Sequence, residues 1–182
     1  MPDIEKQLLE SAKNGDIEAF DDLIARHQEH VFRLAYRMLS NYEDASDVQQ
    51  ETFIRAWQSL KRFRQDAAFS TWLHRITMNL CLSRKRIKIV EEPLFDEELC
   101  STSSSPTACL ERNETVIQVR KVLAGIPAHH RALIVLRDIE ERPFDEIAQI
   151  LECSIESARM RICKSRRLLR ERLKPFMTEE NR

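Results

Sequence analysis

Apolar residues recur at intervals of three and four along most of the chain, and no stretch sustains the alternation typical of a strand. This periodicity predicts an all-α fold. The helices expected in the first ninety residues are 4–13, 17–39, 43–60 and 70–86. Asp16 is a suitable N-cap for the second of them, and Gly15 ends the first because glycine readily adopts the left-handed conformation that closes a helix.

A short helix, a tight break and a basic amphipathic helix follow one another near the C-terminus. The short helix spans 144–151, and the break falls at 152–154. The apolar positions on one side of the next helix are Ile155, Ala158, Ile162, Leu169 and Leu173. The opposite side and its margins carry Met160, Lys164, Arg167, Arg159, Arg166 and Arg170. The pattern predicts a helix-turn-helix whose second helix enters the DNA major groove. A merely solvated charged face is the alternative, which the excess of cations disfavours.

The expected third helix has an unusual outer face. Its core side is formed by Ala45, Val48, Thr52, Phe53, Ala56 and Leu60. The opposite side gathers Asp44, Asp47, Gln50, Glu51 and the apolar Ile54. Such a face is either ordinary solvated surface or a docking patch for a basic partner helix, and the residue pattern alone leaves both readings open. Nothing in the pattern suggests acid–base chemistry for these carboxylates.

Residues 61–88 combine positive charge with aromatic rings. The segment holds eight basic residues against one acidic residue. Its rings are Phe63, Phe69, Trp72 and His74. Cations interleaved with rings suit single-stranded nucleic acid, because phosphates attract charge and unstacked bases stack on rings. The alternative is a plain core face, which accounts for Trp72 and Phe69. It does not account for Phe63 in a polar loop or for Asn79 on a basic helix, so both are candidate contacts.

The net charge of −1 in 182 residues hides an uneven distribution. Residues 1–90 carry 14 Lys and Arg against 13 Asp and Glu, residues 91–114 carry 1 against 7, and residues 115–182 carry 14 against 10. The acidic segment is also rich in serine, so we expect a flexible linker that buries little surface. The sequence thus predicts two small helical domains joined by this linker, and their basic surfaces would meet phosphate.

Composition argues against several classes of protein. No apolar run approaches the ~20 residues of a membrane span, and the first residues lack signal-peptide features, so we expect a cytoplasmic protein without membrane insertion. The five cysteines are odd in number and lack the paired spacing of a zinc site, which predicts neither a metal nor another cofactor. Cys100 and Cys109 could form a redox pair, although idle thiols are expected in a reducing cytosol.

Three segments, taken in order, resemble bacterial RNA polymerase sigma factors of the sigma-70 family, in their extracytoplasmic-function (group 4) branch. Residues 44–57 (DASDVQQETFIRAW) resemble the helix that binds core polymerase. Residues 63–76 (FRQDAAFSTWLHRI) and Asn79 resemble the segment that reads the −10 element. Residues 126–131 (IPAHHR) and the helix-turn-helix resemble the −35 domain. The resemblance covers nearly the whole chain and implies an all-α fold of regions 2 and 4 without a region 3.

The resemblance also implies a role for each segment. The residues it implicates in binding the β′ clamp helices of core RNA polymerase are Asp44, Asp47, Gln50, Glu51 and Ile54. Those implicated in single-stranded −10 DNA are Arg62, Phe63, Arg64, Asp66, Ala67, Arg75, Asn79, Arg84 and Lys85. Those implicated in duplex −35 DNA are Ser157, Arg159, Met160, Arg161, Cys163, Lys164, Arg166 and Arg167. Further implied partners are the polymerase β flap and an anti-sigma factor, which could hold the protein at the membrane. The acidic linker resembles a segment that runs through the polymerase RNA path.

The chain departs from the family in the helix-turn-helix. Glu152 stands where the turn usually has glycine, and a non-glycine residue at positive φ costs about 1 kcal/mol. Ser157 can still contact phosphate. Lys164 could donate to guanine, whereas Met160 and Cys163 offer contacts to a thymine methyl group. The −35 sequence therefore cannot be copied from relatives.

Two other functions account for less of the chain. A duplex-binding repressor or activator would use the C-terminal domain alone and would leave the third helix and residues 63–79 unexplained. A thiol enzyme built on Cys81 and His74 has no oxyanion-type loop and no residue that orients the histidine. The sequence therefore predicts a transcription initiation factor that is not itself an enzyme.

Overall fold

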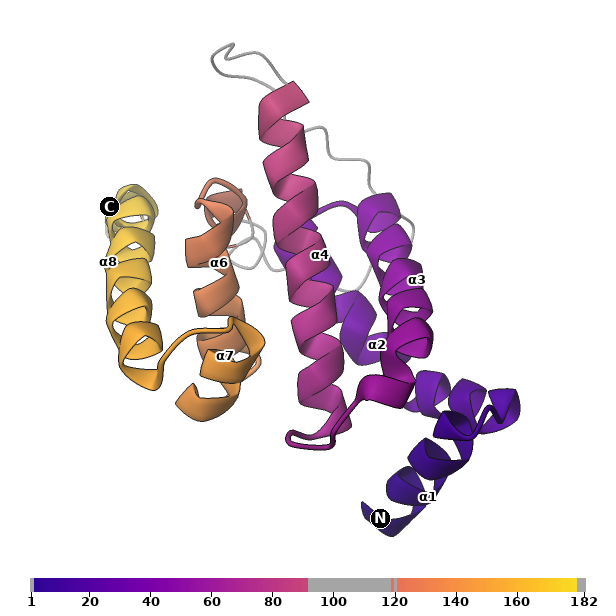
Figure 1. Cartoon of the computed structure of the whole chain (residues 1–182). Helices are drawn as coiled ribbons and strands as arrows, with labels where there is room; N and C mark the ends of the chain where they lie inside the picture. Colours follow the sequence, from indigo (N-terminus) through magenta and orange to yellow (C-terminus); the bar gives the residue numbers. More distant parts are fainter. Residues whose placement is uncertain (1, 92–118, 120, 180–182) are drawn as a thin grey trace.

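The computed structural model describes residues 2–91, 119 and 121–179, and these residues form helices and the turns between them (Figure 1). The N-terminal elements are α1 (Pro2–Lys13), α2 (Ile17–Leu39), α3 (Tyr42–Ser59), the 3₁₀ turn η1 (Leu60–Arg62) and α4 (Phe69–Glu91). The C-terminal elements are α6 (Ala128–Ile134), the π-helical segment η3 (Val135–Ile139), α7 (Phe144–Ile150) and α8 (Ile155–Glu179). We call α1 to α4 the N-terminal bundle and α6 to α8 the C-terminal bundle. The predicted all-α fold with two helical regions is confirmed.

Residues 92–114 of the expected linker lie outside the described residues, and so do Cys100 and Cys109. Within the part of the chain that the structure describes, no helix is both long and apolar enough to cross a membrane.

Polar caps and one glycine set the helix boundaries near the predicted positions. Asp16 Oδ1 accepts a hydrogen bond of 3.2 Å from the backbone N–H of Ala19, which fixes the start of α2. Gly15 has φ +100°, a conformation that a side chain would strain. Asn41 caps α3 in the same way, since its Oδ1 accepts a 2.9 Å bond from the N–H of Asp44.

One hydrophobic core lies where α1 and η1 meet α2, α3 and the start of α4. Its buried members are Leu9, Ala12, Ala19, Phe20, Leu23, Val31, Ala56, Leu60, Phe63, Phe69, Trp72 and Leu73. The rings of Phe63, Phe69 and Trp72 cluster with centroids 4.7 to 5.9 Å apart. Aromatic pairs in this geometry add stability beyond the area that they bury.

Phe63 is only 7% exposed, so the expectation that it has no core role is wrong. Its loop is polar, but it folds back on the apolar start of α4, and the Phe63 ring stacks on Trp72. The Lys13 Nζ donates a 2.6 Å hydrogen bond to the Phe63 carbonyl oxygen and lies 5.4 Å from the centre of the ring. The ring is therefore not free to stack on a base in this arrangement.

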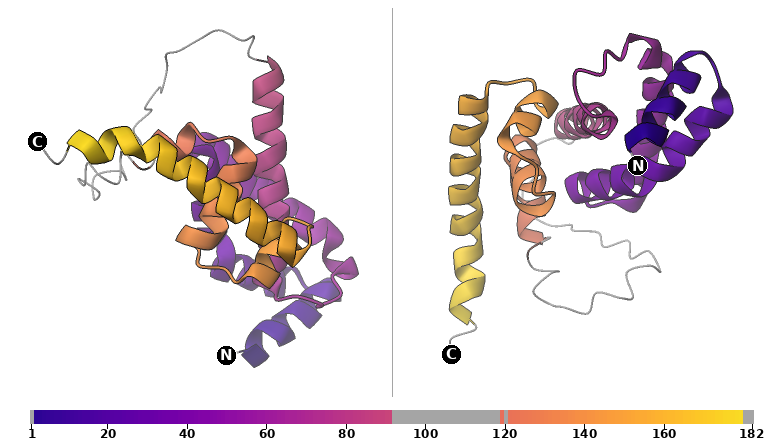
Figure 2. Two further views of the ribbon diagram at one scale, coloured as in Figure 1. Left: turned by 90° about the vertical axis from the view of Figure 1, so that its left-hand side faces the viewer. Right: turned by 90° about the horizontal axis from the view of Figure 1, so that it is seen from below.

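A second core joins the two bundles. Its N-terminal members are Leu34, Ala35, Met38, Leu39, Ala45, Val48, Met78 and Cys81. Its C-terminal members are Ala132, Leu133, Val135, Leu136, Ile147, Ala148, Ile150, Ala158 and Ile162. Helix α4 is central to this arrangement, because α2 and α3 pack on one side of it and α6 and α7 on the other (Figures 1 and 2). The described parts of the two bundles therefore share apolar interior rather than touching only at their surfaces.

Arg131 of α6 lies inside this shared interior at 1% exposure. Its Nη1 donates a 2.6 Å hydrogen bond to the carbonyl oxygen of Met38 in α2. Its Nη2 donates to the carbonyl oxygens of Ala124 and, at 3.3 Å, Ile126. Burial lowers the pKa of the Arg131 guanidinium from its ordinary value, but three carbonyl dipoles support the buried charge.

Further polar contacts cross between the bundles. The pairs are Arg37 with Glu140, Thr71 with Glu146 at 3.4 Å, His74 with Arg142 at 3.5 Å, and Arg75 with Glu152 at 3.9 Å. Each pair brings together residues at least 68 positions apart. Local sequence patterns carry no signal for contacts over such a separation.

Candidate nucleic-acid and partner interfaces

The turn between α7 and α8 has the tight geometry of a helix-turn-helix. The Cys153 N–H donates to the carbonyl oxygen of Ala148 at 3.0 Å, and Glu152 has φ +51°, as expected for a position that usually carries glycine. The Ser154 Oγ accepts a 3.2 Å bond from the N–H of Ser157 and so caps α8. Ala158 is fully buried, and its small side chain lets α8 pack closely on the rest of the C-terminal bundle.

Helix α8 packs on α6 and α7, on the side of them that lies away from α4 (Figures 1 and 2). Met160 is 66% exposed. The other exposed candidates on this helix are Arg159, Arg161, Cys163, Lys164, Arg166 and Arg167, whereas Ser157 is half-buried. The Arg159 guanidinium lies 5.3 Å from the centre of the Phe144 ring, and this cation–π contact holds the Arg159 side chain near α7. The structure therefore leaves all the predicted −35 residues except Ser157 exposed on one helix.

Arg166 is held within the C-terminal bundle. Its Nε donates to Asp138 Oδ1 and Oδ2 at 3.0 and 3.2 Å, and its Nη2 also donates to Oδ1. This bidentate pairing raises the pKa of Arg166 from its ordinary value. The contact with Asp138 of η3 fixes the guanidinium in one orientation.

Helix α3 exposes Asp47, Gln50 and Ile54 of the predicted docking residues, whereas Asp44 and Glu51 are half-buried. Ile54 is 52% exposed, and Gln50 beside it is open to solvent. The Glu51 carboxylate accepts a 2.6 Å bond from the Nε of Arg55 one turn further on. Trp57, which sequence reasoning did not select, is 37% exposed next to Ile54 and packs on Phe20 at 4.9 Å. An aromatic residue three positions after an exposed isoleucine was the signal that could have identified it.

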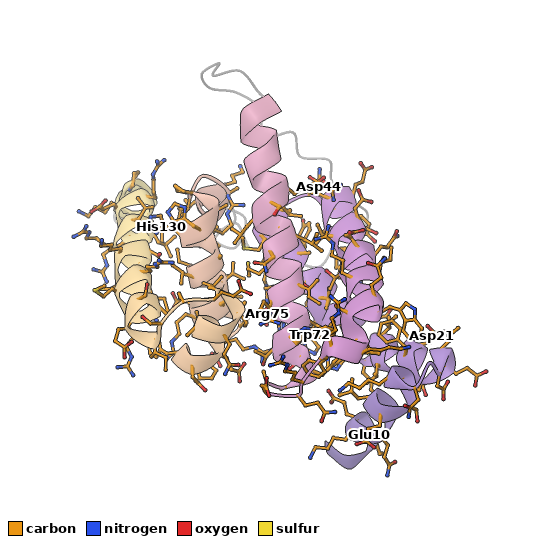
Figure 3. All side chains as sticks on the ribbon, in the orientation of Figure 1. Glu10, Asp21, Asp44, Trp72, Arg75 and His130 are labelled. Atoms are coloured by element: carbon orange, nitrogen blue, oxygen red, sulfur yellow. The ribbon has the colours of Figure 1, made fainter. Side chains whose placement is uncertain are left out.

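Arg84 connects two of the predicted sets of residues. Its Nη2 donates to Asp47 Oδ2 at 2.8 Å, its Nη1 donates to the Asp44 carbonyl oxygen at 3.1 Å, and its Nε lies 3.6 Å from Asp44 Oδ1. Figure 3 shows Asp44 at the start of α3, close to α4. In this structure Arg84 thus faces the α3 carboxylates. Lys85 follows it in α4, and its side chain lies outside those described.

The loop between η1 and α4 offers charged side chains around a fixed base. Arg62, Arg64 and Asp66 are exposed, and Ala67 is half-buried. The buried ring of Phe63 anchors the loop, while Gln65 takes φ +60° and turns the chain. The loop therefore has a rigid attachment and a polar rim, which suits the binding of an unstacked nucleotide.

Two predicted residues of α4 lie one turn apart. Asn79 is exposed, whereas Arg75 is half-buried and its Nε lies 3.9 Å from Glu152 Oε1 in the helix-turn-helix. Figure 3 shows Arg75 on the side of α4 that faces the C-terminal bundle. The structure therefore leaves Asn79 accessible and engages Arg75 in a contact between the bundles.

Comparison with protein families identifies both halves of the chain. The family described as Sigma-70 region 2 matches residues 23–88, and the family described as Sigma-70, region 4 matches residues 117–169. These matches correspond to most of the N-terminal bundle and to the C-terminal bundle up to the middle of α8.

Individual proteins match over nearly the full length. The chain is 30% identical to an RNA polymerase sigma-H factor from Pseudomonas aeruginosa, over 96% of each chain. It is 33% identical to the ECF RNA polymerase sigma factor SigW from Bacillus subtilis, over 93% of this chain and 96% of that one. Among solved structures, CnrH in complex with the cytosolic domain of CnrY is 27% identical and superposes with a TM-score of 0.71, covering 94% of this chain and 98% of that one.

Proposed function

This chain belongs to the extracytoplasmic-function branch of the sigma-70 family, and we propose that the exposed face of α3 binds core polymerase while those of α4 and α8 recognise the promoter. A sigma factor directs core RNA polymerase to promoters and so initiates transcription. The chemistry of RNA synthesis belongs to the polymerase, and this chain is not an enzyme.

The acidic side of α3 is the proposed docking surface for the β′ clamp helices. Ile54 and Trp57 supply exposed apolar area, and Asp47, Gln50 and Glu51 supply the polar rim around it. An apolar centre with a charged rim is the usual composition of a protein interface. The ion pairs of Asp47 with Arg84 and of Glu51 with Arg55 hold the carboxylates in fixed positions before the polymerase binds.

The loop after η1 and the exposed side of α4 are the proposed −10 surface. Arg62, Arg64 and Asp66 surround the position at which a flipped base would enter, and Asn79 would read a neighbouring base. Phe63 has an indirect role in this proposal, because its buried ring stacks on Trp72 and so holds the loop in place. Single-stranded DNA is recognised here by charge and fixed loop shape rather than by the face of that ring.

The outer side of α8 is the proposed −35 surface, and its exposure is the observation that carries the proposal most directly. Lys164 can donate to guanine, and Met160 and Cys163 can contact a thymine methyl group in the major groove. Arg166 and Arg167 are placed to contact phosphate and would position the helix without specifying sequence.

We call the arrangement in which the two bundles share one core the closed arrangement. In this arrangement the chain cannot contact both promoter elements at once. The centres of the −10 and −35 elements lie about 25 base pairs apart, or about 85 Å at about 3.4 Å per pair. A compact chain of 182 residues has an expected radius of gyration of only about 16 Å. We therefore infer that the bundles separate on the polymerase and that the contacts of Arg131 with Met38 break as they do so.

An anti-sigma factor is the proposed inhibitor, as membership of the family implies, and the similar protein CnrH has been solved with a bound partner, the cytosolic domain of CnrY. The proposed site of action is the cytoplasm, with the chain free or held at the membrane through such a partner. The polymerase β flap is the proposed contact of the C-terminal bundle, and the acidic residues 91–114 are proposed to pass through the polymerase RNA path.

Transcription in vitro tests the proposal. Purified protein is added to core polymerase that lacks sigma factors, with a fragmented genomic library as template, and the transcript starts are mapped. We expect starts that share one −10 and one −35 motif, and we expect none with core alone. Specific duplex binding without any specific start would instead identify a duplex-binding regulator.

A further inference from the structure

A cavity of about 500 Å³ opens where α1, α2 and the start of α4 face the segment before α7. None of the proposed promoter or polymerase contacts lines it. Its lining includes two arginines, Arg26 and Arg142, and three histidines, His27, His30 and His74. Ser70 and a single carboxylate, that of Glu5, complete the polar lining.

Three buried nitrogen atoms of this lining have no hydrogen-bond partner. They are Nε2 of His74, Nε2 of His27 and Nε of Arg142. His74 is only 3% exposed, and its Nδ1 lies 3.5 Å from Arg142 Nη2. His27 Nε2 lies 3.4 Å from Glu5 Oε1, which is its ion-pair partner when the imidazole is protonated. Buried polar atoms are rarely left unpaired, and all three of these can donate.

The electrostatics of the cavity favour an anion. The lining holds two arginines and three histidines against one carboxylate, and a second carboxylate, Glu146, pairs with Arg142 Nη1 at 3.1 Å from outside the lining. The cationic residues therefore outnumber the carboxylates, and the described residues contain no cluster of His, Cys, Asp or Glu that could hold a metal ion. Burial and then the charge of Arg142 lower the pKa of His74 to about 4. Burial also lowers the pKa of His27, and Glu5 opposes that effect. An anion among these groups would stabilise their protonated forms.

We propose that this cavity binds a small oxyanion, either inorganic or as the phosphate or sulfate group of a small metabolite, with Arg26, His27, His74 and Arg142 as its donors. Arg142 belongs to the C-terminal half of the chain, whereas the other three donors belong to the N-terminal bundle. A bound oxyanion therefore bridges the two bundles and stabilises the closed arrangement. That regulatory consequence rests on the proposed sigma function, but the binding itself does not.

Calorimetric titration of the full chain with sodium sulfate tests the binding, with sodium chloride of equal ionic strength as reference. We expect saturable binding of sulfate. Arg26→Gln should weaken it about tenfold, because it removes one charge-assisted hydrogen bond from an exposed position that does not threaten the fold. Arg170→Gln removes one exposed positive charge on α8 and should leave the affinity unchanged. Absence of saturable binding, or equal loss in both variants, would overturn the site.

The pH dependence tests the role of the histidines. The charged and polar groups around His27 and His74 are Glu5 of α1, Arg26 and His30 of α2, the Ser70 carbonyl of α4, and Arg142 with its partner Glu146. Sulfate keeps its charge between pH 5.5 and 7.5, so a change in affinity over this range reports on the protein. We expect several-fold tighter binding at pH 5.5. An affinity independent of pH would overturn the assignment of the two histidines as donors.

Inorganic phosphate and a phosphorylated sugar distinguish the two sources of the oxyanion. Similar affinities would indicate a site for the free ion, and tighter binding of the sugar phosphate would indicate a metabolite. Polymerase binding then tests the bridge, since sulfate should weaken core binding by the natural chain more than by Arg26→Gln. Equal weakening would overturn the bridge. A chain that bound sulfate but never supported transcription would overturn the sigma proposal and leave the site intact.

Discussion

The guanidinium of Arg131 in α6 donates a 2.6 Å hydrogen bond to the main-chain carbonyl oxygen of Met38 in α2. This charged group is almost fully buried, and it joins the two bundles by a hydrogen bond to a backbone atom. Because the acceptors are carbonyl groups and not side chains, no substitution at position 38 can remove them. The contact is therefore controlled by residue 131 alone.

Replacement of Arg131 by Met should lower the free energy of unfolding by about 3 kcal/mol. The apolar side chain fills similar volume but leaves the carbonyl oxygens of Met38, Ala124 and Ile126 without their donor. Urea unfolding of the full chain measures the change. Arg170→Met, at an exposed position of α8, should stay within about 0.5 kcal/mol of the natural chain. Similar effects of the two substitutions would contradict the structural role of Arg131.

The double substitution of Asp47 and Glu51 by Ala should lower the affinity for core polymerase and leave the fold intact. Both side chains are on the outer side of α3, where their loss creates no cavity. A pull-down with core polymerase measures the binding. The matched control is the double substitution of Asp21 and Glu29 by Ala, two exposed acids of α2. Equal retention of polymerase by both variants would remove the docking role from α3.

Lys164→Ala should relax the preference at one base pair of the −35 element by about 1 to 3 kcal/mol, because a base-edge contact is lost. Arg166→Ala should instead weaken binding evenly across sequences, because its guanidinium is fixed by Asp138. Promoter variants with single base substitutions, transcribed in vitro with each protein, separate the two effects. An unaltered profile for Lys164→Ala would contradict the assignment.

Phe63→Ala should destabilise the chain by about 3 kcal/mol or more, since a buried ring that stacks on Trp72 is removed. Asn79→Ala should leave stability within about 0.5 kcal/mol, because Asn79 is exposed. Thermal unfolding compares them. In transcription, Asn79→Ala should alter the preference at one −10 position. A Phe63→Ala protein that is stable but has a −10 defect would indicate that the Phe63 ring contacts DNA directly.

Stability should fall as the pH decreases from about 6.5 toward 4. The pKa of His74 is about 4 in the folded chain against 6.5 for an unperturbed histidine. In that window the unfolded chain binds a proton that the folded chain does not, which costs up to about 3 kcal/mol near the lower limit. Above pH 6.5 both forms are neutral and the effect vanishes. Urea midpoints across this range measure it, and His74→Gln should flatten the curve.

Local chemistry was sufficient to predict the helices of the N-terminal bundle and both helices of the helix-turn-helix, although α6 and η3 were not predicted as separate elements. Asp16 and Gly15 mark the boundary between α1 and α2 through cap geometry that depends only on neighbouring residues. The left-handed conformation of Glu152 was likewise predictable from its place in the turn. The outer faces of α3 and α8 follow from helical periodicity, which also needs no distant partner.

Contacts between distant segments were not predictable in this way. The burial of Phe63 was not predicted because its neighbours are polar, and its apolar partner Trp72 is reached only when the loop folds back. The side chain of Arg84 meets Asp47 across 37 positions. The contacts of Arg131 were still less predictable, since its acceptors are backbone carbonyl oxygens, which every residue type carries.

One side of α4 packs on α7, and the same helix carries residues proposed to hold the −10 strand. Under the proposed function, the helix-turn-helix and promoter DNA compete for Arg75, because Glu152 Oε1 lies 3.9 Å from its Nε in the closed arrangement. For such a competition the apparent affinity for DNA equals the intrinsic affinity multiplied by the fraction of open molecules. If about one molecule in a hundred is open, the chain alone binds −10 DNA about a hundredfold more weakly than its own surface allows. If core polymerase separates the bundles, it therefore raises the affinity for −10 DNA by a factor that the open fraction of the free chain determines.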